Sequence, residues 1–332
     1  MGTHDACQEH SSSGLPARRT DSTTPPTDGS VIRLLAFNLE HDGGPDTGDC
    51  LPERWQQAHE LIASRRPDLL LRQEMTYSRD GHHRRLHAAE LALGMRGFLG
   101  PAGLGRNPSG LFVRESAFAV HQHVVHQVHP WRTPPTHAVL RLRDVPDVDI
   151  IAVSWHAAFN SPRGRERETD EILAIADKIN GGRAFIGGGD CNEAPSPSGE
   201  TVPPIAWDSV TDRLHMNHRT NRDPITGQHT ACTYLDDSLT AAGLRDPARH
   251  AAHTLDRPDA LLATAGHGKS RQGGPCRIDR FYLDPHLIQA VEDVNVIDTT
   301  GLSDHHAVEV VLSRTAMARA LRRAADNPGG NT

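Results

Sequence analysis

Lysine is nearly missing from this sequence of 332 residues. It occurs only at positions 178 and 269, so arginine carries almost all of the positive charge. The formal net charge is −7 with histidine neutral. Because a protein dedicated to nucleic acid usually presents a basic face, this balance argues weakly against such a protein. The hydrophobic share of 36% is on the low side but suffices for a core.

Closely spaced cysteine pairs and long apolar segments are missing as well. The five cysteines are scattered, odd in number and without a CxxC spacing, which favours reduced thiols in a cytoplasm over a disulfide framework. The N-terminus, MGTHDACQEHSSSG, has no apolar region typical of a secretory signal. No stretch is apolar and long enough to span a membrane. We therefore expect a cytoplasmic, monomeric protein without membrane contact.

The ends of the chain differ in composition from its centre. Residues 1–30 are rich in Ser, Thr, Pro, Gly and charge, which predicts a disordered leader. Residues 31–314 are expected to form a single domain, and residues 315–332 a short helix with a disordered tail. The segment from about 195 to 275 has little periodic pattern. It predicts a long loop that shapes specificity, with some helix around residues 234–243.

Short apolar runs alternate with amphipathic segments between these ends. Trp55, Ala58 and Ile62 share one face of a predicted helix that begins at Pro52 and ends before Pro67. Two further helices are predicted at residues 85–94 and 166–179. Predicted strands cover residues 31–37, 68–74, 111–114, 136–143, 149–156, 183–190, 277–284, 291–298 and 307–312. Many strands, few helices and no internal repeat indicate one α/β or α+β sandwich.

Polar side chains cluster at or near the ends of the predicted strands. They are Asn38, Glu74, His156, Asp190, Asn192, Asp279, Asp304 and His305. Side chains at strand ends of one sheet converge on one rim, where sheet proteins commonly bind their ligands. One such residue means little, because loops are polar anyway. Six independent places that each offer a carboxylate, an amide or an imidazole predict a site.

These residue types together support a narrow chemistry. Carboxylates and amides without paired thiolates select hard cations such as Mg²⁺ or Mn²⁺ over Zn²⁺. A His and an Asn beside a divalent cation can bind a phosphate oxygen and the charge that develops on it, and a further Asp can deprotonate a water. A His paired with a buried Asp has a fixed tautomer and a raised pKa. The set describes metal-assisted attack of water on a phosphoester.

Six short stretches carry a resemblance to a known family. In these stretches the sequence resembles the endonuclease/exonuclease/phosphatase superfamily, which includes pancreatic-type deoxyribonuclease, abasic-site endonucleases, inositol polyphosphate 5-phosphatases and neutral sphingomyelinases. They occur in the family's order within residues 31–312 and read FNLEHDGG, RPDLLLRQE, AVSWH, IGGGDCNEAPS, RIDRFYL and SDHHAVEV. Each is weak alone, whereas all six in order are specific. The resemblance implies a four-layer α/β/β/α sandwich of two packed mixed sheets flanked by helices, with the site at one rim.

The resemblance also implies which residues hold a metal ion. Asn38 and Glu74 would hold Mg²⁺ or Mn²⁺, and Asp304 would be a further contact, direct or through water. The match to SDH-x-x-V selects His305 as the functional histidine. His306 falls at a variable position of that motif and is expected to matter little.

The remaining matches imply roles in catalysis. His156 would bind the scissile phosphate. Asp190 would orient and deprotonate the attacking water, and Asn192 would contact the phosphate and help to hold Asp190. His305, oriented by Asp279, would stabilise or protonate phosphate oxygens in the transition state.

A few residues depart from the usual motifs or stand outside them. Cys191 is the middle residue of GD-x-N and is expected to be a small buried hydrophobe rather than a redox group. Arg72 stands where an apolar residue is more usual, and would either bind substrate phosphate or form an ordinary salt bridge. Arg163 and Arg165 would either grip a charged substrate or belong to a surface ion-pair cluster. The histidine-rich residues 121–129 predict a solvated strand or loop rather than a metal site.

Three functions are compatible with these features. The first is a metal-dependent phosphodiesterase that acts on nucleic acid or a nucleotide, which the family's most populous activities favour. The second is a phosphatase or phosphodiesterase for a small phosphorylated metabolite, such as one of a bacterial secondary-metabolism pathway, which the acidic balance slightly favours. The third, a protein that keeps the fold but only binds, is least favoured because all the expected catalytic groups are present.

Overall fold

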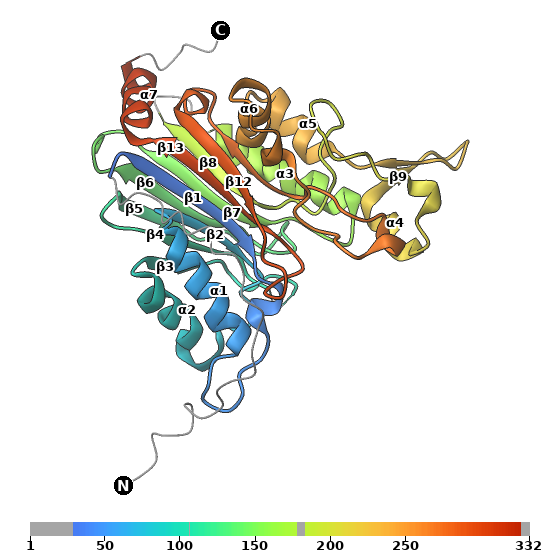
Figure 1. Cartoon of the computed structure of the whole chain (residues 1–332), viewed down its shortest axis with the longest axis horizontal. Helices are drawn as coiled ribbons and strands as arrows, with labels where there is room; N and C mark the ends of the chain where they lie inside the picture. Colours follow the sequence, from blue (N-terminus) through green and yellow to red (C-terminus); the bar gives the residue numbers. More distant parts are fainter. Residues whose placement is uncertain (1–28, 106, 178–182, 327–332) are drawn as a thin grey trace, which may run out of the picture.

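Two mixed β-sheets packed face to face form the centre of the molecule (Figure 1). This computed structural model describes residues 29–105, 107–177 and 183–326. The six-stranded sheet contains, in spatial order, β12 (Val291–Ile297), β13 (Ala307–Ser313), β1 (Val31–Asn38), β2 (Leu69–Gln73), β4 (Gly110–Val113) and β3 (Arg96–Leu99). The five-stranded sheet contains β11 (Asp279–Leu283), β8 (Ala184–Asp190), β7 (Ile150–His156), β6 (Thr136–Leu142) and β5 (Phe118–Val124).

Helices cover the outer face of each sheet, which confirms the predicted four-layer α/β/β/α sandwich. The helices α1 and α2 pack on the six-stranded sheet, and α3 and α5 pack on the five-stranded sheet. The longer helices are α1 (Glu53–Arg65), α2 (Asp80–Leu93), α3 (Pro162–Asp177), α5 (Tyr234–Ala241), α6 (Pro247–Thr254) and α7 (Arg314–Asp326). Short 3-10 helices are η1 (Glu40–Gly43), η2 (Trp207–Ser209), η3 (Pro258–Leu261), η4 (Ser270–Gln272) and η5 (Ile288–Ala290). No helix in the described ranges is long and apolar enough to cross a membrane.

Strand alternation separates the core into layers. Leu34 and Leu69 belong to the apolar cluster between the two sheets, whereas their neighbours Leu35 and Leu70 belong to the cluster under α1 and α2. Successive residues of a strand point to opposite faces, so a strand covered on both sides must be apolar at nearly every position. This is why VIRLLAF and DLLLRQ read as continuous apolar runs.

The predicted site residues lie at one rim because of strand direction. In the six-stranded sheet β1 and β2 run parallel, so Asn38 and Glu74 come at neighbouring strand ends. In the five-stranded sheet β7 and β8 also run parallel, and His156 pairs in register with Asp190. The antiparallel strand β11 begins at the same rim, where Asp279 pairs with Asp190.

The glycine before Asp190 lies in β8, where the backbone of β7 and a side chain of the other sheet approach it closely. Gly189 has a φ of +138°, and a Cβ there would lie 2.1 Å from the carbonyl oxygen of Trp155 and 2.7 Å from Nε2 of Gln73. Gln73 itself donates a hydrogen bond of 3.1 Å from the other sheet to Oγ of Ser154. Only glycine fits this position, which explains the sequence GGGD.

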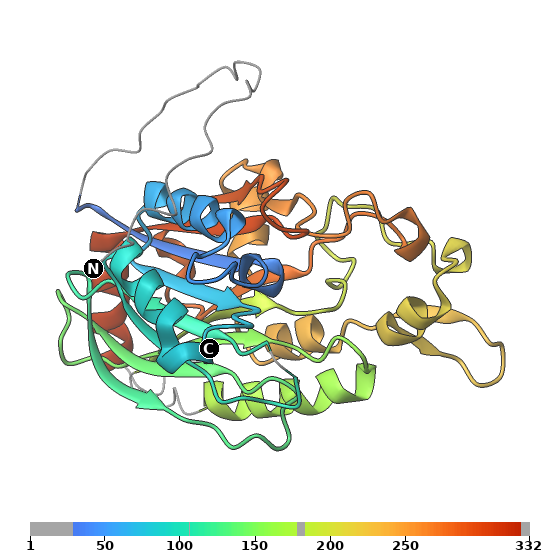
Figure 2. The same cartoon turned by 90° about the horizontal axis from the view of Figure 1, so that it is seen from below.

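The segment expected as a long loop contains regular structure. Besides α5 and α6, it includes α4 (Arg213–Arg219) and a hairpin of β9 (Thr220–Arg222) and β10 (His229–Ala231). In both views α4 and β9 project beyond the sheets, away from α7 (Figures 1 and 2). The expected helix around residues 234–243 is present as α5. The other elements went unpredicted because strands of three residues and a helix of seven are too short for a clear periodic pattern.

Two further expectations concern the cysteines and the ends of the chain. The thiols of Cys191, Cys232 and Cys276 are free, as expected, but Cys50 is disulfide-bonded. The prediction of reduced thiols is therefore wrong at Cys50, because spacing in the sequence does not reveal which thiols meet in space. The predicted leader lies outside the described residues except for its last two positions, and the tail beyond residue 326 lies outside them entirely.

Candidate active site

A cavity of about 380 Å³ opens at the rim where the strand ends meet. Six of the predicted residues line it, namely Glu74, His156, Asp190, Asn192, Asp304 and His305. Two more, Asn38 and Asp279, are fully or almost fully buried and contact residues that line the cavity. The structure thus brings these eight residues together, although they lie as far as 267 positions apart in the chain.

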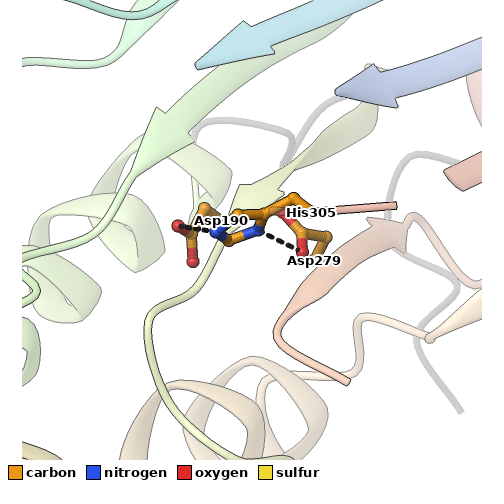
Figure 3. Close-up of side chains that lie close together, drawn as sticks. All are labelled: Asp190, Asp279 and His305. Atoms are coloured by element: carbon orange, nitrogen blue, oxygen red, sulfur yellow. Dashed lines mark hydrogen bonds and ion pairs between the residues drawn. The ribbon is translucent and has the colours of Figure 1, made fainter. Parts of the chain in front are cut away.

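Asp190, His305 and Asp279 form a line of charged groups (Figure 3). The Nδ1 of His305 donates a 2.8 Å hydrogen bond to Oδ2 of Asp279, and its Nε2 lies 3.8 Å from Oδ2 of Asp190. Burial by itself would lower the pKa of His305, but the carboxylates of Asp279 and Asp190 outweigh it and raise that pKa to about 10. His305 is therefore a cation at neutral pH, with its tautomer and ring plane set by Asp279.

Asp190 is held as a carboxylate by the groups around it. Its Oδ1 accepts a 2.8 Å hydrogen bond from the backbone N–H of Asn192, and its Oδ2 accepts one of 3.1 Å from Nδ2 of Asn38. Burial would raise the pKa of Asp190, but the positive charges of His305 and His156 keep it below its ordinary value. Asn192 reaches this position with a φ of +52°, a conformation that asparagine adopts more readily than most residues.

His156 completes the polar end of the five-stranded sheet. It is buried, and its Nε2 lies 3.5 Å from Oδ2 of Asp190. Its Nδ1 is also buried and has no hydrogen-bond partner within the described part of the chain. A buried ring nitrogen without a partner is costly unless a ligand or water satisfies it. This imidazole therefore has a free hydrogen-bonding position inside the site.

The residues predicted as metal ligands lie together on the six-stranded sheet's side of the site. Oε1 of Glu74 lies 3.5 Å from Nδ2 of Asn38, while Oδ1 of Asn38 is buried without a partner among the described residues. An orphaned amide oxygen beside a carboxylate fits a hard cation. Nζ of Lys269 donates a 2.6 Å hydrogen bond to Oδ2 of Asp304, so the ammonium group of a lysine already lies at this carboxylate. The donor set fits Mg²⁺ or Mn²⁺.

A second group of potential ligands overlaps the proton-transfer groups. The nearest ligand atoms of Asp190, Asp279 and His305 all lie within 4.8 Å of one another, a spacing that can hold a metal ion. In this group, however, Nδ1 of His305 carries the proton that it donates to Asp279. The site at Asn38 and Glu74 is the better candidate, since its amide oxygen has no competing partner.

Ser303 joins the two sides of the site and was not singled out from the sequence. Its hydroxyl donates a 2.7 Å hydrogen bond to the backbone oxygen of Asn38. The hydroxyl oxygen of Ser303 also accepts hydrogen bonds of 3.2 Å from the backbone N–H groups of Glu40 and His305. The only feature of the sequence that could have identified Ser303 was its position as the first residue of the SDH motif. The motif thus uses its serine to fix the strand ends of β1 and β13 against each other.

Arg72 does not reach the cavity, so the hypothesis that it binds substrate is wrong. It is fully buried, and its Nη2 donates a 3.0 Å hydrogen bond to Oδ1 of Asp42. Alternation along β2 turns Leu71 and Gln73 toward the other sheet and Arg72 toward the layer of α1 and α2. The alternative interpretation, a salt bridge, describes this residue.

Arg163 and Arg165 also lie away from the cavity lining. Arg165 is fully buried, where its Nε lies 3.3 Å from Oε2 of Glu193 and its Nη1 donates a 2.9 Å hydrogen bond to the backbone oxygen of Ala158. It fixes the loop after β7 to the turn after β8, and does not bind substrate. Arg163 is exposed on α3 and is not among the residues around the cavity.

Cys191 is buried as the sequence predicts, and His306 lies outside the lining of the cavity. Cys191 is fully buried, and burial raises the pKa of its thiol to about 12, so the thiolate that redox chemistry needs is disfavoured. His306 turns away from the cavity: its Nδ1 accepts a 3.2 Å hydrogen bond from the backbone N–H of Thr299, and its ring lies 4.4 Å from that of His267.

Solved structures of several enzymes share this arrangement of layers. An AP endonuclease from Archaeoglobus fulgidus aligns with a TM-score of 0.58 at 13% identity, over 85% of this chain and 99% of that one. A 3′ phosphatase from Neisseria, solved with a product DNA hairpin, aligns with a TM-score of 0.55 at 18% identity, over 84% and 98%. An endonuclease/exonuclease/phosphatase family protein from Bacteroides thetaiotaomicron aligns with a TM-score of 0.54 at 15% identity, over 85% and 97%.

These likenesses show that the chain has the fold of the endonuclease/exonuclease/phosphatase superfamily, as its motifs predicted. No protein-family model matches the chain, and no curated protein matches it in sequence. At such low identities the common element is the fold. The activity must therefore be argued from the site itself.

Proposed function

We propose that the protein is a metal-dependent phosphoesterase that hydrolyses its substrate by direct attack of water. The observation that carries this proposal is the placement of a buried, ionised Asp190 between two histidines at the cavity. Asn38 and Glu74, at the adjacent strand ends, offer oxygen ligands to a hard cation. A base, a phosphate-binding cation and a metal site in one cavity support phosphoester hydrolysis.

Each residue has a distinct task in this mechanism. Asp190 accepts the proton of the attacking water, and the N–H of Asn192 and the amide of Asn38 keep its carboxylate aimed at the cavity. His305, held protonated by Asp279, donates a hydrogen bond to a phosphate oxygen on which charge develops. His156 binds the phosphate beside it.

The metal ligands act on the same phosphate. Asn38 and Glu74, with Asp304 close by, would hold Mg²⁺ or Mn²⁺, which when bound supplies positive charge to the phosphate oxygens.

The substrate is proposed to be a phosphodiester of nucleic acid or a nucleotide. In support, one of the similar structures contains a product DNA hairpin and another is an AP endonuclease. A second candidate is a small phosphorylated metabolite. It is favoured by the cavity wall that the segment 195–275 contributes, which encloses the site on one side, and by the net charge of −7.

A metal-dependent screen tests the proposal. The protein is incubated with bis-aryl and mono-aryl phosphate esters, DNA, RNA and nucleotides, in Mg²⁺, Mn²⁺ or EDTA. We expect hydrolysis that EDTA abolishes, and a loss of about 10³-fold or more in Asp190→Asn, which keeps the shape of the side chain but removes the base. Asp147→Asn, at an exposed position, is the matched control. Near-normal turnover in Asp190→Asn would refute the site.

A further inference from the structure

The cavity has a second wall that the proposed mechanism does not use. Besides the catalytic groups, it is lined by Ile205, Trp207, Arg219 and Lys269, all from the segment 195–275. Lys269 already forms an ion pair with Asp304. Arg219 forms none within the described residues, although its charge attracts that of Asp190. The question is what this arginine binds.

Arg219 occupies a fixed position. It is the last residue of α4, and its backbone oxygen accepts a 3.0 Å hydrogen bond from the N–H of Cys232. The helix is anchored by a small apolar cluster in which Met216 packs with Trp207 and Val210. A side chain on such a helix is positioned more tightly than one on a flexible loop.

The side chain of Arg219 is partly buried, and its guanidinium has no hydrogen bond or ion pair within the described residues. Its Nη1 is buried without a hydrogen bond, and no ion pair joins it to a carboxylate anywhere in the described residues. Arg72 and Arg277, by contrast, are paired with Asp42 and Asp246. Arg280 also has buried N–H groups without partners, but it does not line the cavity.

We propose that Arg219 binds a second anionic group of the substrate, a phosphate or carboxylate carried by the leaving part rather than the phosphate that is cleaved. Arg219 offers planar N–H donors that match either group. Ile205 and Trp207 line the same cavity and give it apolar walls. They suit a leaving group with a ring or another flat apolar portion, so the substrate class is a compact phosphate ester with a second acidic group.

This inference rests on the proposed hydrolysis, and the test separates the two. Three aryl phosphate esters are compared, whose leaving phenol is unsubstituted, carries a carboxylate or carries a phosphate. For each ester, kcat/KM of Arg219→Met is divided by that of the wild type, so that differences in leaving-group reactivity cancel. Arg213→Met, at the exposed start of the same helix, is the control.

We expect Arg219→Met to lower kcat/KM about 10- to 100-fold for an ester with a second anion and less than about twofold for the plain ester. Whichever of the carboxylate and phosphate esters shows the larger loss identifies the group that is bound. Arg219→Lys, which keeps the charge, should retain most of the preference and serves if the Met variant does not fold. An equal loss on all three esters, or no loss, would overturn the proposal.

A binding measurement works without turnover. The same esters are titrated by calorimetry in EDTA against the wild type and Arg219→Met. A loss of affinity confined to the doubly anionic esters supports the subsite even if none of the esters is hydrolysed with metal. Equal affinities of the two proteins for every ester would refute the subsite while leaving the hydrolysis proposal intact.

Discussion

The pairing of His305 with Asp279 makes a sharp prediction about pH. Asp279→Asn keeps the size of the side chain and can still contact Nδ1 of His305, but it removes the buried negative charge. Because that charge leads the interactions that raise the pKa of His305, the pKa should fall in the variant. The imidazole then loses its proton at a lower pH, and the donor to the phosphate disappears with it.

The structure sets the size of this effect. The pKa of His305 is about 10, against an ordinary value of 6.5. At about 1.4 kcal/mol per pH unit, the preference for the charged imidazole is on the order of 5 kcal/mol, shared among the neighbouring carboxylates. Removing one opposite charge at hydrogen-bond distance typically lowers a pKa by about 1–3 units. The variant's histidine should therefore titrate at about pH 7–9.

The assay is the pH dependence of kcat under saturating metal. A protonated His305 is present below its pKa, so wild-type activity should hold through neutral pH and fall only as the pH approaches 10. In Asp279→Asn the fall should begin about 1–3 pH units lower, and the smaller protonated fraction of His305 should reduce kcat about 2- to 100-fold at pH 9. If the alkaline limb of the variant coincides with that of the wild type, the assignment of His305 as a cation fixed by Asp279 is wrong.

Two further predictions concern the neighbours of this pair. His305→Ala should reduce turnover about 10²- to 10⁴-fold. The ring of His306 is hydrogen-bonded to Thr299 outside the cavity, so His306→Ala should stay within about twofold of the wild type. Comparable losses in both variants would contradict the choice between the adjacent histidines. Glu74→Gln should raise the Mg²⁺ concentration for half-maximal activity by at least about tenfold, with partial recovery of activity at high Mg²⁺. If that concentration is unchanged, Glu74 is not a metal ligand.

The rim and its charged groups were predictable from the sequence because they depend on local pattern. An apolar run that ends in a polar residue marks a strand end, and strand direction then brings such ends together. Asn38, His156 and Asp190 are the last residues of their strands and Glu74 follows β2 directly, so the motif and the geometry agree. The glycines before Asp190 suggest a turn in the sequence, whereas the structure places them within β8, where close neighbours leave no room for a side chain.

The arginines were harder to predict because their partners are distant in sequence. Arg72 is paired with Asp42, thirty positions away, and Arg165 with Glu193, twenty-eight positions away. Nothing in a linear pattern distinguishes an arginine that meets a buried carboxylate from one that meets a ligand. Arg219 went unnoticed for a related reason, since α4 is too short to reveal which of its side chains faces the cavity.

The hydroxyl of Ser303 has a mechanical consequence for the site. It forms hydrogen bonds with the backbones of Asn38, Glu40 and His305, and so joins the end of β1 to the segment just before β13. A shift of Asn38 on metal binding would therefore be passed to His305 through the hydroxyl of Ser303, and a shift of His305 would be passed to Asn38 in the same way. Metal binding at the site and protonation of His305 would then be coupled.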